Sequence, residues 1–142
     1  MASILQLLTV ISSLLHPGSE ARHADLLIAI SQGAESAEEA IDCLVWSEHE
    51  SRMGEALSGR RWDGRAYGVL QIRDRPELET DVPASVRAWL AMRRAGAAIC
   101  GDDGLAVLSS GACKRGTRLA SERRAEARYW EMVGRRIIGS SP

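Results

Sequence analysis

The chain has little of the chemistry that identifies many protein classes directly. Its three cysteines have no metal-ligand spacing and are too few to staple a small fold. His16, His23 and His49 share no ligand spacing either, which argues against zinc. The sequence also contains no glycine-rich phosphate loop and no Ser-His-Asp order. It therefore predicts no metal and no cofactor.

The few cysteines allow two interpretations. Cys100 and Cys113 are near enough in the chain to close a short disulfide if the protein works in an oxidising compartment. Cys43 lies in an apolar run and is expected to be a small core residue. The sequence does not choose between the bonded and the reduced state of the other two.

Long apolar runs are also missing, so no transmembrane segment is expected. The first apolar stretch, residues 4–15, is interrupted by polar residues and is not preceded by Lys or Arg, which argues against a clear signal peptide. Its apolar residues recur at helical spacing and predict an amphipathic helix that ends before His16-Pro17-Gly18. How the protein would reach a substrate outside the cell stays open.

The 142 residues are 45% apolar and 26% charged, which is ordinary globular composition. The net charge of −1 hides a division, because residues 1–110 carry −6 and residues 111–142 carry +5. A basic end can bind polyanions, but Glu122, Glu126 and Glu131 are interleaved with its arginines as on a solvated helix face. Nucleic acid is therefore not the expected partner.

Periodicity and capping signals predict a mainly α chain with a small irregular or β-hairpin insertion. Helices are expected over residues 4–15, 20–31, 37–51, 83–98, 105–110 and 117–137. Ser36 and Glu39 form the pattern of a capping box for the third helix. We expect one domain over residues 1–142, with N-terminal helices in 1–35, a catalytic core in 36–130 and a helix end and tail in 131–142.

The third helix ends on the most informative motif, Glu50-Ser51-Arg52. Glu50 continues the stripe of Cys43 and Trp46 into the last turn, where burial and the helix dipole both disfavour a carboxylate anion. A raised pKa is what a general acid needs near neutral pH. Glu48 is the rival acid, and His49 between them is expected to be a satisfied polar neighbour.

Further along the chain come Trp62-Asp63-Gly64-Arg65 and Gly68-Val69-Leu70-Gln71-Ile72. Together with Glu50-Ser51, they resemble the glutamate and Gly-Leu-Met-Gln signature of the lytic transglycosylase and goose-type lysozyme superfamily, over about residues 41–129. The resemblance implies a lysozyme-like fold that cuts peptidoglycan at the β-1,4 bond between N-acetylmuramic acid and N-acetylglucosamine. It also implies that Glu50 is the catalytic acid.

The same resemblance assigns roles to other residues. Ser51 would fix the helix end and the site, and Gln71 would bind sugar or merely satisfy nearby backbone. Stacking on sugar rings is expected of Trp62 and Tyr67, and Tyr129 matches a late tyrosine that can reach the site. Leu108 and Ser109 depart from the family's Tyr and Asn in the segment 106–111. The Ser-Gly-Ala-Cys variant at 110–113, followed by arginines, is similar to phage and prophage members.

Two reaction routes stay open at this stage. If Asp63 or Asp74 reaches the cleft and activates water, the enzyme is an inverting hydrolase. If neither does, Glu50 alone serves as acid and then base, and the substrate's own 6-hydroxyl closes a 1,6-anhydro ring. We favour this transglycosylase route, because Arg61 or Arg65 can pair with Asp63.

The expected partners are peptidoglycan strands and, for a phage member, tail or virion proteins. The site of action would be the cell wall, in the periplasm or outside the cell, with a virion as one means of delivery. A different class is a non-catalytic module that binds the wall or builds a phage tail, which the departure at Leu108 and Ser109 favours.

Overall fold

The structure is a computed structural model that describes residues 2–18, 20–55, 65–101, 105–110, 113 and 117–140. In chain order these residues form α1 (Ile4–Leu15), α2 (Glu20–Gly33), α3 (Ala37–Ser51), β1 (Ala66–Tyr67), β2 (Ile72–Arg73), the 3-10 turn η1 (Pro76–Leu78), α4 (Val82–Cys100), α5 (Leu105–Ser110) and α6 (Thr117–Gly139). The prediction of a mainly α chain with a small β-hairpin is confirmed.

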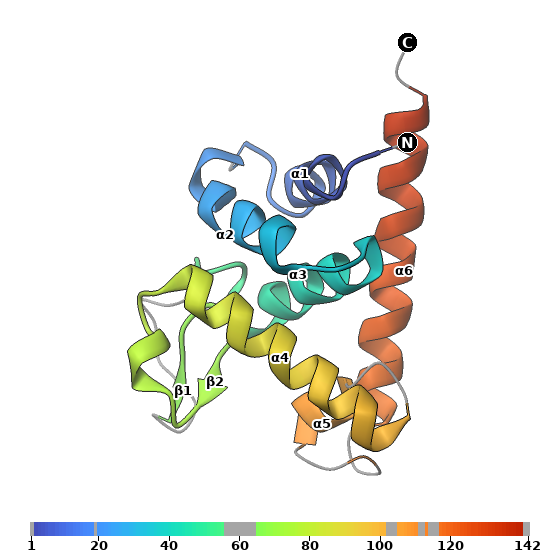
Figure 1. Ribbon diagram of the computed structural model, residues 1–142. Helices are drawn as coiled ribbons and strands as arrows, with labels where there is room; N and C mark the ends of the chain where they lie inside the picture. The colour runs from blue at the N-terminus through green and yellow to red at the C-terminus, as the bar shows by residue number, and fades with distance from the viewer. Residues whose placement is uncertain are drawn as a thin grey trace.

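Helix α3 occupies the centre of the molecule and contacts α1, α2, α4 and α6 (Figure 1). All its residues from Glu39 to Ser47 are buried, which confirms that it is covered on more than one side. The long helix α6 runs along one side of the molecule, and the hairpin lies toward the other (Figure 1). This arrangement fixes the end of α3 between the hairpin and the first turns of α6.

Polar side chains set the helix starts. At α1, Ser3 and Gln6 form a complete capping box. At α3, the Ser36 hydroxyl accepts the backbone N–H of Glu39 at 3.1 Å, as predicted. The Glu39 carboxylate does not return the bond to Ser36, however; it accepts the backbone N–H of Glu35 and turns toward two arginines. The predicted capping box of α3 is therefore only half formed.

The first helix matches its predicted bounds and packs into the core. Leu7, Leu8 and Ile11 are at most 1% exposed, and α1 lies against α2, α3 and α6. Within the described ranges, no helix combines the length and the apolar composition that a bilayer span requires.

The inner face of α6 carries small buried residues, and Trp130 and Ile138 pack against the core beside them. Ala120, Ala127 and Gly134 recur at intervals of seven and are buried. A side chain at Gly134 would come within 3.3 Å of Ile11, so the absence of one lets α6 approach α1 closely. Tyr129 on the same helix is 53% exposed.

The last turn of α4 lies outside the core. The side chain of Ile99 in this turn is 75% exposed. The helix extends two residues beyond the predicted end and is capped by Gly101 in the left-handed conformation. Its last turn thus projects past the core that Trp89 and Leu90 occupy.

The disulfide that the sequence left open is present. Cys100 at the end of α4 is bonded to Cys113, with 5.4 Å between the two Cα atoms. Cys43 is a free thiol in the core, as expected. Closing a 13-residue separation contributes about 3 kcal/mol of stability in the chain-entropy description. The bond connects α4 to the segment that leads into α6.

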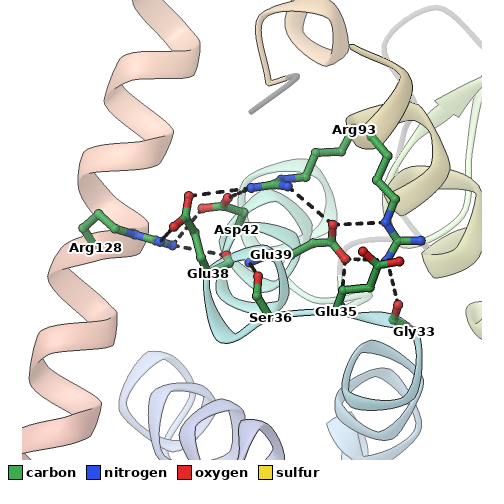
Figure 2. Close-up of polar contacts among 9 residues, drawn as sticks. Gly33, Glu35, Ser36, Glu38, Glu39, Asp42, Arg93 and Arg128 are labelled. Atoms are coloured by element: carbon green, nitrogen blue, oxygen red, sulfur yellow. Dashed lines mark hydrogen bonds and ion pairs between the residues drawn. The ribbon is translucent and has the colours of Figure 1, made fainter. Parts of the chain in front are cut away.

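A cluster of charged side chains, buried at its centre, joins three helices (Figure 2). Its acids come from the first half of α3, and its arginines come from α4 and α6. The members are Glu38, Glu39, Asp42, Arg93, Arg94 and Arg128. Asp42 is at the middle, because its carboxylate accepts from Arg93 at 2.7 Å and from Arg128 at 3.0 Å. This cluster fixes α4 and α6 relative to α3.

Candidate active site at the end of helix α3

Helix α3 leaves the core at its last turn, and the candidate acid lies there. Trp46, one turn earlier on the same stripe, is 3% exposed and packs against Trp89 with ring centroids 6.0 Å apart. Glu50 is exposed, whereas the sequence predicted burial. The stripe is therefore buried at Cys43 and Trp46 but not at Glu50.

The turn after Glu50 has an uncommon backbone. Arg52 and Met53 both have positive φ values, 52° and 55°, and their N–H groups bond back to the carbonyls of Glu48 and Ser47. Within the described residues, the other non-glycine residues with positive φ are Gln71 and Asp74, on the hairpin. Such conformations cost about 1–3 kcal/mol each and cluster at functional sites. Two of the four lie directly after Glu50-Ser51, and Gln71 lies in the turn that Ser51 bonds.

Ser51 connects the helix end to the hairpin. Its buried hydroxyl donates to the carbonyl of Val69 at 2.6 Å and accepts the N–H of Gly54 at 2.9 Å. The prediction placed Ser51 as the residue that fixes the helix end and the site, and these bonds fit that role. The sequence motif Glu-Ser is thereby joined physically to the motif Gly68–Ile72.

The hairpin places its tip inside the protein. Its strands pair Ala66 with Arg73 and Tyr67 with Ile72, and the four residues between them form a turn. Val69 and Leu70 in this turn are each 2% exposed. Residues 67–72 therefore form two short strand ends around a buried turn.

Gly68 cannot be replaced by a larger residue without movement. Its φ is +78°, and a Cβ atom would lie 2.5 Å from the carbonyl oxygen of Leu78 and 2.8 Å from the Ser85 hydroxyl. Those two groups are bonded to each other at 3.0 Å, so the space cannot open easily. The glycine of the motif thus allows the hairpin to pack on η1 and α4.

Gln71 is held by this turn. Its side-chain N–H donates to the carbonyl of Gly68 at 2.8 Å, and its backbone N–H donates to the same oxygen at 3.0 Å. Of the two roles predicted for Gln71, the structure contains the hydrogen bond to nearby backbone. The side chain is half-buried, and its amide oxygen and second N–H remain for a ligand.

The charge environment of Glu50 comes from two helices. Loss of hydration raises the pKa of its carboxyl, and the positive charge of Arg123 on α6 and of His49 on α3 partly opposes that rise. No hydrogen bond or ion pair joins the Glu50 carboxylate to another residue in the described ranges. A raised pKa on an unpaired carboxyl at the surface is the property predicted for a general acid.

The raised pKa of Glu50 predicts a pH-dependent gain of stability on removing its charge. The folded state binds the proton of the Glu50 carboxyl more tightly than the unfolded chain does. The stability that this protonation contributes is therefore full below the ordinary pKa of 4.5 and is lost as the pH rises through the raised value. Glu50→Gln should therefore increase the free energy of unfolding at about pH 7 and leave it unchanged at about pH 4. Urea titrations at the two pH values measure this.

Glu77→Gln is the control of opposite sign. A hydrogen bond from Arg75 lowers the pKa of Glu77, so removing that charge should lower stability at neutral pH or leave it unchanged. A loss of stability for Glu50→Gln at about pH 7 would contradict the environment described for Glu50.

The rival acid is engaged elsewhere. Glu48 lies 2.6 Å from the Nε2 atom of His16, and the Nδ1 atom of the same ring lies 3.2 Å from Glu55. His49 also has a partner, since its Nε2 atom is 2.6 Å from the carboxylate of Glu126 on α6. These pairs hold the end of α3 against α1 and α6, and of these four glutamates Glu50 is the one without a bonded partner in the described residues.

Asp74, a candidate second carboxylate, forms a two-pronged pair with Arg65. The two bonds measure 2.9 and 2.7 Å, and they lower the pKa of Asp74. A carboxylate with a lowered pKa is a weaker base for activating water. Arg65 is one of the two arginines, with Arg61, that the sequence offered as a partner for Asp63. Asp63 and Trp62 lie outside the described residues, and so do the adjoining positions from 56 to 64.

The two candidate tyrosines lie on different elements. Tyr67 is half-buried on β1, beside the turn that Ser51 anchors. Tyr129 contacts the ring of Trp130 edge-on, with centroids 5.2 Å apart. It is six residues, or about 9 Å of helix, beyond Arg123, which is the α6 residue that acts on Glu50.

A depression in the surface lies away from these residues. Its volume is about 380 Å³, and its lining comes from α2, including Asp25 and Ile28, and from Thr80, Val82 and Pro83 near the start of α4. None of the predicted site residues lines it. Within the described ranges, no three His, Cys, Asp or Glu side chains have the geometry to hold a metal ion.

The sequence did not single out Arg123, which has the strongest opposing effect on the pKa of Glu50. It was one of eight basic residues at the end of the chain, and nothing in their pattern separated it from the rest. Comparison with known proteins adds no assignment: no family model, no curated protein and no solved structure matches this chain.

Proposed function

We propose that this protein cleaves peptidoglycan strands at the bond between N-acetylmuramic acid and N-acetylglucosamine, as a lytic transglycosylase with Glu50 as its acid. One observation carries the proposal: an unpaired carboxyl with a raised pKa ends a buried helix, and the next residue, Ser51, bonds to the turn Gly68–Gln71. The motifs that resemble the superfamily are thus adjacent in space. The unusual backbone at Arg52 and Gln71 adds support.

The chemistry requires one group that gives and then takes a proton. Protonated Glu50 donates to the glycosidic oxygen, and the bond from that oxygen to C1 of the muramic acid breaks with help from the substrate's N-acetyl group. The 6-hydroxyl of the same sugar then bonds to C1 and returns its proton to Glu50. No water is consumed, and the product ends in a 1,6-anhydro ring.

The pairing of Asp74 favours this route over hydrolysis. An inverting hydrolase needs a second carboxylate to activate water, and Arg65 holds Asp74 in a form that is a weak base. The disulfide between Cys100 and Cys113 is compatible with action outside the reducing cytoplasm, where peptidoglycan lies. Delivery by a phage particle is one route to that place.

The experiment is incubation of the purified protein with peptidoglycan, followed by mass spectrometry of the released fragments. We expect muropeptides with anhydro ends, lighter by one water than those with reducing ends. Reducing ends would overturn the transglycosylase route and select hydrolysis. Binding to the wall without release of fragments would overturn catalysis and select a wall-binding module.

A further inference from the structure

Arg123 is a cation without a bonded partner beside the candidate acid. It is half-buried on α6, with its guanidinium carbon 5.7 Å from the ring centroid of Trp46. Its Nε atom is buried and has no hydrogen-bond partner. It acts on Glu50 at a distance, since no ion pair joins the two within the described residues. Two unpaired charges of opposite sign thus lie near each other on α3 and α6.

The carboxylates nearest to Arg123 in sequence are bound to other groups. Glu122 lies 3.3 Å from Arg118, and Glu126 lies 2.6 Å from His49. Other arginines of the same helix have acidic partners, as Arg128 and Arg135 do. These two carboxylates on α6 therefore have other bonded partners, and with Glu50 they act on Arg123 only through their charge.

A guanidinium group in this position is suited to one kind of ligand. Its planar fork matches a carboxylate through two parallel hydrogen bonds, and partial burial strengthens such a bond. The face of Trp46 supports the fork from below and limits its orientations. A neutral sugar hydroxyl would satisfy the donors less well.

We propose that Arg123 binds a carboxylate carried by the muramic acid unit of the substrate, next to the bond that Glu50 protonates. This inference rests on the proposed function and specifies its substrate as an acidic glycan. The carboxylate has two sources: the lactyl group, where the stem peptide has been removed, and the stem peptide itself, where it remains. Chitooligosaccharides, which have the same β-1,4 N-acetylglucosamine backbone, have neither.

The test measures binding rather than turnover, in a Glu50→Gln background so that the ligands stay intact. The ligands are soluble glycan strands with stem peptides, strands stripped of peptides by an amidase, and chitohexaose. We expect Arg123→Gln to weaken binding of a carboxylated strand about tenfold or more and to leave binding of chitohexaose within about twofold. Loss with the stripped strand assigns the lactyl carboxylate, and loss only with the intact strand assigns the peptide.

Arg118→Gln is the matched control, because it removes the same charge from the same helix at a side chain that is 94% exposed. It should leave all three affinities unchanged. Arg123→Lys keeps the charge and the stem over Trp46 but lacks the fork. Its affinity for a carboxylated strand should therefore lie between that of the parent with Arg123 and that of Arg123→Gln. It also supplies the comparison if Arg123→Gln does not fold.

Equal losses for carboxylated strands and chitohexaose, or no loss for either, would overturn the role of Arg123. Failure of the Arg123 inference can be distinguished from failure of the proposed function. A protein that binds acidic strands through Arg123 but releases no fragments from peptidoglycan would retain this inference and lose the catalytic one.

Discussion

Replacing Asp42 with Asn is expected to lower the free energy of unfolding by about 3–5 kcal/mol. The Asp42 carboxylate has no exposed surface and accepts hydrogen bonds from Arg93 on α4 and Arg128 on α6. Without its charge, the guanidinium of Arg93, itself only 10% exposed, loses its closest counter-ion. Breaking a buried pair from one side is costly because the remaining charge stays buried.

The measurement is equilibrium unfolding in urea at neutral pH, for Asp42→Asn and for a surface control. Glu122→Gln is the control, since it also removes one carboxylate that pairs with an arginine, but at positions 59% and 94% exposed. Its effect should stay within about 0.5 kcal/mol. A loss below about 1 kcal/mol for Asp42→Asn would contradict the view that this cluster fixes three helices together.

The helices could be predicted from local sequence because local features set their bounds. The start of α3 follows from the cap at Ser36, and its apolar stretch ends at Trp46, one turn before the helix ends at Ser51. The same holds for α1, which begins after the cap at Ser3 and ends before Pro17. In these places the signal and the structure involve residues only a few positions apart.

The charged cluster could not be predicted because its partners are far apart in sequence. Arg93 is 51 positions from Asp42, and Arg128 is 86 positions from it. A local reading assigned Glu39 to the cap of its own helix, whereas the structure pairs it with arginines of α4. Periodicity identifies which side of a helix is buried, but not which charges meet there.

The candidate site could be predicted only in part, because some of its features depend on residues that are far apart in sequence. The proximity of Glu50-Ser51 to Gly68–Gln71 follows from a motif that the sequence contained, and the bond from Ser51 to Val69 places them together. The exposure of Glu50, the partner of Arg65 and the position of Arg123 depend on how α6 and the hairpin pack. No pattern within a single segment encodes them.

Replacing Glu50 with Gln is expected to lower the rate of glycan cleavage by about 10²- to 10⁴-fold, because an amide cannot donate a proton to the leaving oxygen. Binding of the strand should persist, since the change alters one atom of a side chain that has no bonded partner in the described residues. Glu48→Gln is the matched control. Its carboxylate pairs with His16 and has no assigned role in the reaction, so the variant should keep cleaving wherever it remains folded.

The most direct test of the account is the initial rate of release of anhydro muropeptides from purified peptidoglycan by wild type, Glu50→Gln and Glu48→Gln. Circular dichroism would first establish that all three are folded at the assay temperature. The account predicts release by wild type and Glu48→Gln and almost none by Glu50→Gln. Equal release by Glu50→Gln and wild type would contradict the assignment of Glu50 as the proton donor.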